Sequence, residues 1–469
     1  MLRGQGVLLS GHELHRFGTD HVRMDGTGRL STVLWGSTLA LGHTGGSDLK
    51  SLAGAGAQRS IPAIAARPIP SPQEISMSVS AYDSFAELPA VDWDALTVGS
   101  NIYSTSGFVG VREEALPPEA HARYLLARDS DGTPVAGLEV YCFTKAPHDL
   151  YAPGDVLGEV ISDERAARLN TRPISIAAGW SEFRGQVPGH VNASAEQRES
   201  ALSQLTAEAL RFAEQADSSV LAYCYLPLET ARELTKAHSS DGAVMLLHNV
   251  ETRMPIGLWA DFDDYVDWLP AGRRQRVRRE LRRFRESGRV VTELPLPEVV
   301  KEIAPLNSAL MQKYGHAAHD EERAVTIFDR QSRFLGDESS VLLCKENGKA
   351  VGFVLRYRQH DMLYARAAGF DYSVPNADDY YNLMFYHQIA SGVGRKVSSI
   401  HLGINTYEAK MRRGGRPTPL YSVFVGVDRP LEAQDSVVRE YNRTRSADFL
   451  AKHNKYVTGG INTDDWLLD

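Results

Sequence analysis

The sequence has only three cysteines among its 469 residues: Cys142, Cys224 and Cys344. They form no Cys-x-x-Cys pair, and a sparse, odd set of this kind provides neither a disulfide framework nor a zinc site. Each cysteine lies within or beside an apolar run, as buried thiols do. We therefore expect no bound metal, and we predict a reducing, cytoplasmic location.

Long apolar stretches and common catalytic motifs are missing as well. No uninterrupted apolar run reaches the roughly 18 residues that a membrane-spanning helix needs, so no membrane partner is predicted. The sequence contains neither a Gly-x-Ser-x-Gly elbow nor a Walker phosphate-binding loop. A serine hydrolase of the elbow type and a P-loop nucleotidase are therefore disfavoured.

The overall composition is that of a globular protein, with 43% hydrophobic and 23% charged residues and a formal net charge of −8. A chain of this length is long for one domain and comfortable for two. Residues 1–76 differ from the rest because they hold 12 of the 39 glycines and end in a proline-rich stretch. We predict a flexible extension there.

Against this acidic background, one short stretch is strongly basic. It carries only two acids, and its nine arginines are Arg273, Arg274, Arg276, Arg278, Arg279, Arg282, Arg283, Arg285 and Arg289. Val277, Leu281 and Phe284 recur at the spacing of one helical face, so the pattern predicts an amphipathic helix docked by a narrow apolar stripe. Such single-sign charge favours an anionic partner, with phosphate preferred. The alternative is a solvated basic surface.

Two segments of the chain resemble each other. Residues 131–141 and 347–357 each place an Asp-Gly or Asn-Gly pair before alternating apolar residues, which predicts a β-hairpin. Helical sequence precedes each hairpin, at 82–97 and 113–120 in the first half and at 297–314 and 321–335 in the second. Each hairpin is followed by a predicted helix and strand, at 195–216 and 218–226 and again at 377–392 and 398–403. This repeated order predicts an α+β fold with two halves, each a mixed, mostly antiparallel sheet flanked by helices. Two unrelated mixed domains would also fit it.

This order, together with particular residues, resembles the GNAT (N-acetyltransferase) fold in tandem. The matching parts are the arginine helix, the hairpin 347–352, the strand 363–370, Tyr380-Tyr381 and the segment 403–410. They are similar to the Fem-type aminoacyl-tRNA transferases and to the related peptidoglycan-biosynthesis and cellulose-biosynthesis-type acyltransferases.

The resemblance covers roughly residues 80–430 and suggests how the chain is divided. We expect the extension at 1–76, one GNAT-like domain at 77–255, a second that carries the site at 256–430, and a helical tail at 431–469.

The resemblance implies an acyltransferase that moves an aminoacyl or acyl group onto a small-molecule amine acceptor. It gives Lys410 the role of polarising the donor carbonyl. For proton transfer the best carboxylate is Asp371, between strand and helix. Substrate contacts are expected from Arg273, Arg274, Arg276, Arg278, Tyr364, Arg366, Tyr381 and Tyr407.

One motif that acyl-coenzyme A-dependent enzymes of this fold use is missing, and this bears on the identity of the acyl donor. Acetyltransferases of this fold hold the coenzyme A pyrophosphate with a glycine-rich turn at a helix N-terminus. The matching stretch of the second half, 369–379, is acidic and lacks that turn, and in the first half 186–189 is only a partial match. The Fem-type enzymes share this departure, so the resemblance implies aminoacyl-tRNA as donor and no tightly bound cofactor. The alternatives are an acyl-coenzyme A-dependent N-acyltransferase and a non-catalytic protein that binds tRNA or another anion.

Overall fold

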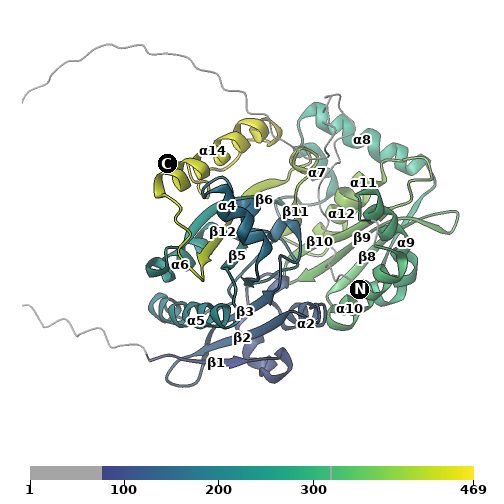
Figure 1. Ribbon diagram of the computed structural model, residues 1–469. Coiled ribbons are helices and arrows are strands. Elements are labelled where there is room, and N and C mark those ends of the chain that lie inside the picture. Colours follow the sequence, from purple (N-terminus) through teal and green to yellow (C-terminus); the bar gives the residue numbers. More distant parts are fainter. Residues whose placement is uncertain (1–75, 317–318, 469) are drawn as a thin grey trace, which may run out of the picture. The chain divides into compact units, whose positions relative to one another are not determined.

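The computed structural model describes residues 76–316 and 319–468. In these ranges twelve strands form one continuous sheet, in the order β1-β2-β3-β4-β5-β12-β6-β11-β10-β9-β8-β7 (Figure 1). The strands are β1 (Ser78–Tyr82), β2 (His121–Arg128), β3 (Pro134–Phe143), β4 (Ile174–Ala177), β5 (Val220–Leu226), β6 (Val244–Pro255), β7 (Val290–Pro295), β8 (Ser339–Glu346), β9 (Lys349–Gln359), β10 (Met362–Phe370), β11 (Ser399–Ile404) and β12 (Arg416–Gly426). The predicted α+β fold is confirmed.

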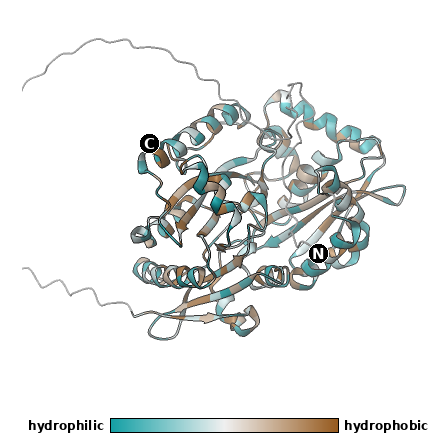
Figure 2. Ribbon diagram, in the orientation of Figure 1, coloured by the Kyte–Doolittle hydropathy of each residue, from teal (hydrophilic) through white to brown (hydrophobic). Residues whose placement is uncertain are grey.

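Helices cover both faces of this sheet. They are α1 (Ala90–Leu96), α2 (Ser106–Glu114), α3 (Pro153–Leu157), α4 (Asp163–Thr171), α5 (Ala195–Gln215), α6 (Leu228–Ala237), α7 (Phe262–Trp268), α8 (Ala271–Glu286), α9 (Leu296–Lys313), α10 (Glu321–Leu335), α11 (Asp379–Tyr381), the π-helix η5 (Asn382–Tyr386), α12 (His387–Val393), α13 (Tyr407–Met411) and α14 (Asp435–His453). In the second half, α8 and α12 pack on one face, and α9 and α10 pack on the other (Figure 1). The strands are mostly hydrophobic, whereas α8 is mostly hydrophilic (Figure 2).

The two halves repeat the same topology and exchange their final strands. Strands β1–β5 and β7–β11 run in the same order outward from the centre, and each set contains one parallel pair, β4 with β5 and β10 with β11. The last strand, β12, lies between β5 and β6, while β6 pairs with β11. The proposed boundary after residue 255 coincides with the end of β6, and the sheet continues across it.

Local sequence explains the two hairpin turns. Asn347 and Gly348 both have positive φ angles, 51° and 80°, as a two-residue type I′ turn between β8 and β9 requires. In the turn between β2 and β3, Gly132 alone has a positive φ, 78°, and its N–H donates to the carbonyl oxygen of Asp129. Both predicted hairpins are present, and the first has the longer turn.

Most predicted helices and strands are observed, with some exceptions. Helical sequence was expected at 113–120, but α2 ends at Glu114, because Pro117 and Pro118 cannot continue a helix. The helix expected at 377–392 is divided into α11, η5 and α12. The predicted flexible extension lies outside the described residues, except for Ser76. In the described ranges no helix is long and apolar enough to cross a membrane.

The exchanged strands lead to a prediction about residues 76–255 expressed alone. All seven residues of β5 are buried, and without β12 the hydrogen-bonding edge of this strand would be open. We expect this fragment not to unfold cooperatively, whereas residues 76–469 should show a cooperative transition in thermal circular dichroism. A cooperative transition of the fragment near that of the longer chain would contradict this view of the fold.

Candidate active site

The parallel strands β10 and β11 separate near the centre of the sheet. Their last paired residues are Tyr364 and His401, after which a bulge interrupts β10 and the register of β11 also shifts. In the first half, β4 and β5 part in the same way after Ala177 and Tyr223. The carboxyl ends of parallel strands are common ligand sites, so the opening beyond Tyr364 and His401 is the candidate site.

The segment 403–416, which joins β11 to β12, borders this opening. Gly403, Asn405 and Thr406 have φ angles of 67°, 62° and 47°, all in the left-handed region. For the two residues other than glycine this conformation costs of order 1–3 kcal/mol each, and such strain is typical of functional sites. The turn leads directly into α13, which carries Lys410.

Lys410 is buried, with 2% of its surface exposed. Its Nζ donates to the carbonyl oxygens of Gly403, at 3.0 Å, and Ile404, at 2.6 Å. Burial lowers the pKa of this ammonium group to about 7. Two of the three N–H groups of the charged lysine are thus used to hold the end of β11.

Helix α8 confirms the expected amphipathic pattern. Val277 and Phe284 are buried, Leu281 is half-buried against them, and Gly288 follows the helix end with a φ of 71°. The exposed faces carry most of the arginines: Arg276, Arg278, Arg279, Arg282, Arg283 and Arg285. The helix therefore presents a broad guanidinium surface on an apolar anchor.

A buried ion pair attaches this helix to the segment 403–416. Nη2 of Arg413 lies 2.9 and 2.8 Å from the two carboxylate oxygens of Glu280, which also accepts a hydrogen bond from the hydroxyl group of Tyr386. The guanidinium of Arg413 stacks over Tyr381, 3.6 Å from the ring centroid. The structure thus brings α8, the predicted Tyr381 and the segment of Lys410 into one cluster.

The sequence placed Tyr386 beside the expected cleft and Arg413 in the segment of Lys410, but it did not predict that both bind Glu280. Glu280 lies three residues after Val277 and four before Phe284, on the apolar side of α8, so a buried acid could have been inferred from its position. Its partner is 133 residues away in sequence, and no local pattern indicates it.

The four arginines predicted to bind phosphate all have protein partners. Arg273 donates to Thr458 Oγ1, at 3.2 Å, while Arg274 and Arg278 each lie 3.3 Å from the carboxylate of Asp267. Arg276 lies 3.6 Å from Glu280. In the part of the chain that the structure describes, Arg282 and Arg285 form no ion pair and extend the same helix surface.

The remaining predicted residues occupy different surroundings. Tyr364 is buried, and it is the last residue of β10 that pairs with β11. Arg366 donates to the carbonyl oxygen of Ser181 at 3.3 Å. The Tyr407 hydroxyl donates to Asn249 Oδ1 at 2.7 Å, and its ring packs on α14.

Asp371 lies in the turn after β10. Its carboxylate accepts from the side chain and backbone of Ser373 and pairs with Lys349 at 3.0 Å. These bonds, led by that from the Ser373 hydroxyl, lower the pKa of Asp371 to about 2. Such a carboxylate is a weak base at neutral pH, and none of its hydrogen bonds reaches Lys410 or α8.

The helix N-termini that hold pyrophosphate in related folds are occupied by side chains here. In the second half, Asp379 pairs with Arg289 and accepts from the backbone of Ala377. In the first half, Ser194 and Gln197 form a capping box at the start of α5.

The partial match at 186–189 is used in packing. The side-chain oxygen of Gln186 accepts two hydrogen bonds from Asn101, and Gly189 forms a bridge with Ala136 of β3. This stretch therefore supports the edge of the first-half sheet.

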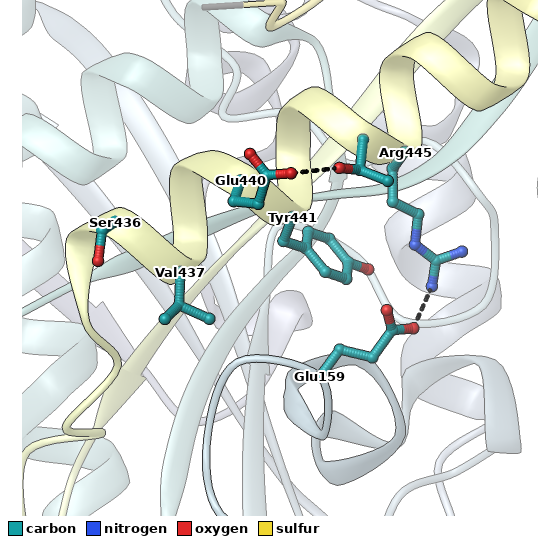
Figure 3. A pocket seen from close by; sticks show the side chains of 7 residues that line it. Glu159, Ser436, Val437, Glu440, Tyr441 and Arg445 are labelled. Carbon is teal, nitrogen blue, oxygen red and sulfur yellow. Dashed lines mark hydrogen bonds and ion pairs between the residues drawn. The ribbon is translucent and has the colours of Figure 1, made fainter. Parts of the chain in front are cut away.

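Two surface pockets lie away from this cluster. One, of about 370 Å³, is lined by Glu159 and by side chains of α14 such as Tyr441 and Arg445 (Figure 3). Its polar groups pair with one another, as Arg445 and Glu159 do at 3.0 Å. The other, of about 420 Å³, lies between the start of β12 and residues 459–466. Neither is lined by Lys410 or by an arginine of α8.

With this geometry in place, comparison with known proteins decides the family. A family profile named FemAB-like, described as peptidoglycan biosynthesis/recognition, matches residues 187–458, which is more than half of the chain. The chain belongs to the FemAB-like family. A search of curated proteins finds no match.

The crystal structure of FemX shows the same fold, and two further solved structures are similar over much of the chain. The crystal structure of FemX is 10% identical and aligns with 73% of this chain and 97% of that one, with a TM-score of 0.50. A tandem GNAT protein from the clavulanic acid pathway is 12% identical over 77% of this chain and 100% of that one, with a TM-score of 0.42. The C-terminal domain of a putative lysylphosphatidylglycerol synthetase from Agrobacterium fabrum is 10% identical over 73% and 92%, with a TM-score of 0.44.

The predicted resemblance to Fem-type proteins is therefore confirmed. This FemAB-like protein is an enzyme, a peptidoglycan-related transferase of acyl or aminoacyl groups.

The buried pair gives a stability prediction for the FemAB-like protein. Replacing Glu280 by Ala leaves the guanidinium of Arg413 buried without its acid, which should lower the free energy of unfolding by about 3–5 kcal/mol in denaturant titration. Glu286→Ala, an exposed acid of the same helix, should change it by less than about 0.5 kcal/mol. Equal effects of the two substitutions would show that the pair does not anchor α8.

Lys410 gives a pH prediction. In the folded protein the ammonium group of Lys410 loses its proton near pH 7, because burial lowers its pKa to about 7. In the unfolded chain the group keeps this proton up to the ordinary pKa of lysine. Between these values the unfolded state binds more protons, so the group makes stability rise with pH. The stability difference between wild type and Lys410→Met should therefore shift in favour of wild type from about pH 7 to about pH 9. Lys452→Met, at an exposed position, should show no such shift, and a flat difference for Lys410 would contradict its burial.

Proposed function

We propose that this FemAB-like protein transfers the aminoacyl group of an aminoacyl-tRNA to an amine of a peptidoglycan precursor. The observation that carries the proposal is the attachment of the arginine surface of α8 to the segment of Lys410, through Glu280 and Arg413. A surface of guanidinium groups suits the phosphates of a nucleic acid, and its place beside the strand opening puts such a donor next to the reacting groups.

The chemistry needs little more than positioning and charge stabilisation. The amine nitrogen attacks the ester carbonyl of the donor, the new C–N bond forms, and negative charge collects on the carbonyl oxygen. Lys410 would donate its remaining N–H to that oxygen. The C–O bond of the ester then breaks, and the ribose hydroxyl leaves with a proton.

Two features favour tRNA over acyl-coenzyme A as donor. The helix start after β4 is capped by Ser194 with Gln197, and at the helix start after β10 the carboxylate of Asp379 pairs with Arg289. A pyrophosphate would have to displace these bonds, and in the second half it would meet an acidic loop. The free anion-binding capacity lies instead on α8.

The other predicted residues keep roles within this proposal. Tyr381 and Arg366 would contact the substrates near the opening, and Tyr364 would shape its floor. Arg273, Arg274, Arg276 and Arg278 would contribute positive potential to the donor surface rather than direct phosphate contacts, because each already has a partner. Tyr407 would hold α13 in place. Since charged tRNA occurs in the cytoplasm, the enzyme would act there.

The test offers purified protein two sets of donors. One set contains tRNAs charged with single amino acids, the other contains acyl-coenzyme A esters, and both are combined with a UDP-linked muramoyl peptide as acceptor. Mass spectrometry should detect a product with one added residue only with charged tRNA. A product formed only from acyl-coenzyme A, or micromolar binding of coenzyme A in calorimetry, would overturn the donor assignment.

The arginine surface has its own readout. Arg282→Ala combined with Arg285→Ala should weaken tRNA binding and lower the magnitude of its salt-dependence slope by about 1 to 2. The matched control removes Arg211 and Arg439, two exposed arginines on α5 and α14. If the control and the α8 variant behave alike, the surface of α8 is not the binding site.

A further inference from the structure

A second buried charge cluster lies at the last β10–β11 pair, between β11 and β6. Its centre is Glu251 on β6, which is completely buried. The carboxylate accepts from Arg184 of the first half, from Arg253 Nε at 3.1 Å and from His401 Nε2 at 2.9 Å. Burial alone would raise the pKa of Glu251, but Arg184, His401 and Arg253 together hold it below its usual value. Glu251 is therefore an ionised acid surrounded by basic groups.

Two nitrogen atoms in this cluster lack a partner in the described part of the chain. They are Nδ1 of His401, a residue that is 3% exposed, and Nε of Arg184. Buried polar atoms are nearly always satisfied, and exceptions often mark a water or a reacting group. Since Nε2 of His401 donates to Glu251, Nδ1 carries the lone pair. An unused acceptor and an unused donor around one carboxylate suit a small group that can both donate and accept, as an amine or a water can.

The position of His401 connects this cluster with the opening. His401 forms the last pair between β10 and β11, and its ring packs on Tyr364 and Tyr103, at centroid distances of 5.5 and 6.1 Å. Gly403, whose carbonyl oxygen binds Lys410, lies two residues further along the same strand. His401 and the carbonyl group that binds Lys410 are thus two residues apart at the end of β11, where its pairing with β10 stops.

We propose that His401 is the general base of the reaction, with Glu251 as its positioning residue. Nδ1 takes a proton from the attacking amine, directly or through one water, as the C–N bond forms, and returns it to the leaving oxygen as the C–O bond breaks. Glu251 fixes the tautomer by accepting from Nε2 and stabilises the imidazolium that forms. The assignment rests on the proposed amide-forming reaction but not on tRNA as donor. The amine must lose a proton whichever acyl donor it attacks.

The charged and polar surroundings suit this role. Burial lowers the pKa of His401 more than the nearby Glu251 raises it, so the ring is neutral and able to accept a proton at pH 7. The groups that face it are Glu251 and Arg253 on β6, Arg184 from the first half, and the Tyr103 and Tyr364 rings.

Another buried histidine provides a contrast. His238 has both ring nitrogens bonded, Nε2 to the Tyr223 hydroxyl at 2.9 Å and Nδ1 to Asp241 at 2.8 Å. A histidine that serves only to stabilise the fold is expected to look like this one. His401 differs in its unfilled nitrogen.

The kinetic test uses His401→Gln, whose amide can still donate to Glu251 but cannot take up a proton. With the donor and acceptor that turn over, kcat should fall by about 10²- to 10⁴-fold at unchanged KM, and the acidic limb of the pH–rate profile should disappear. Hydroxylamine, an acceptor that is uncharged at neutral pH, should restore much of the rate. His238→Gln should keep the wild-type kcat per folded molecule. A wild-type kcat and pH profile for His401→Gln would overturn the proposal.

A second measurement does not depend on finding the substrates. In full-length protein labelled with ¹⁵N-histidine, the ring of His401 should be neutral at pH 7 and carry its hydrogen on Nε2. An imidazolium ring, or the opposite tautomer, would contradict the base assignment. Failure of every tRNA donor with this ring state intact would count against the proposed donor alone.

Discussion

The placement of β12 between β5 and β6 is the constraint on which the rest of the structure depends. A strand from the end of the chain completes the sheet of the first half, and β6 from the middle of the chain completes that of the second. Neither half can therefore bury its central strand without the other. The same exchange sets β6 beside the end of β11, so that Glu251 meets His401 of the second half and Arg184 of the first.

Two buried acids then fix the positions of α8 and of the side chains at the end of β11. Glu280 holds α8 against Arg413, and Glu251 holds His401 and two arginines at the strand opening. Burying such charges costs several kcal/mol per ion unless partners compensate, so each acid specifies one arrangement of its neighbours. Ion pairs thus position the arginine surface and the strand end. The apolar stripe of Val277 and Phe284 packs α8 against the hydrophobic core.

Local pattern predicted much of this architecture. The spacing of Val277, Leu281 and Phe284 gave the docked face of α8, and the Asn347-Gly348 turn gave a hairpin, because both depend on residues a few positions apart. The strand exchange and the partners of Glu251 depend on contacts across 150 residues, such as that with His401, and leave no local signal. The sequence also pointed to Arg274 and Arg278 as phosphate ligands, although both pair with Asp267, which lies only 7 and 11 residues away.

The central claim is that the arginine helix and the segment of Lys410 form one site for a tRNA donor. Hydrogen–deuterium exchange of the full chain with and without tRNA tests it most directly, because exchange reports each segment separately. We expect tRNA to slow exchange in both 271–286 and 403–416, and coenzyme A to protect neither segment. Protection of the start of α5 by coenzyme A, with no effect of tRNA on α8, would contradict it.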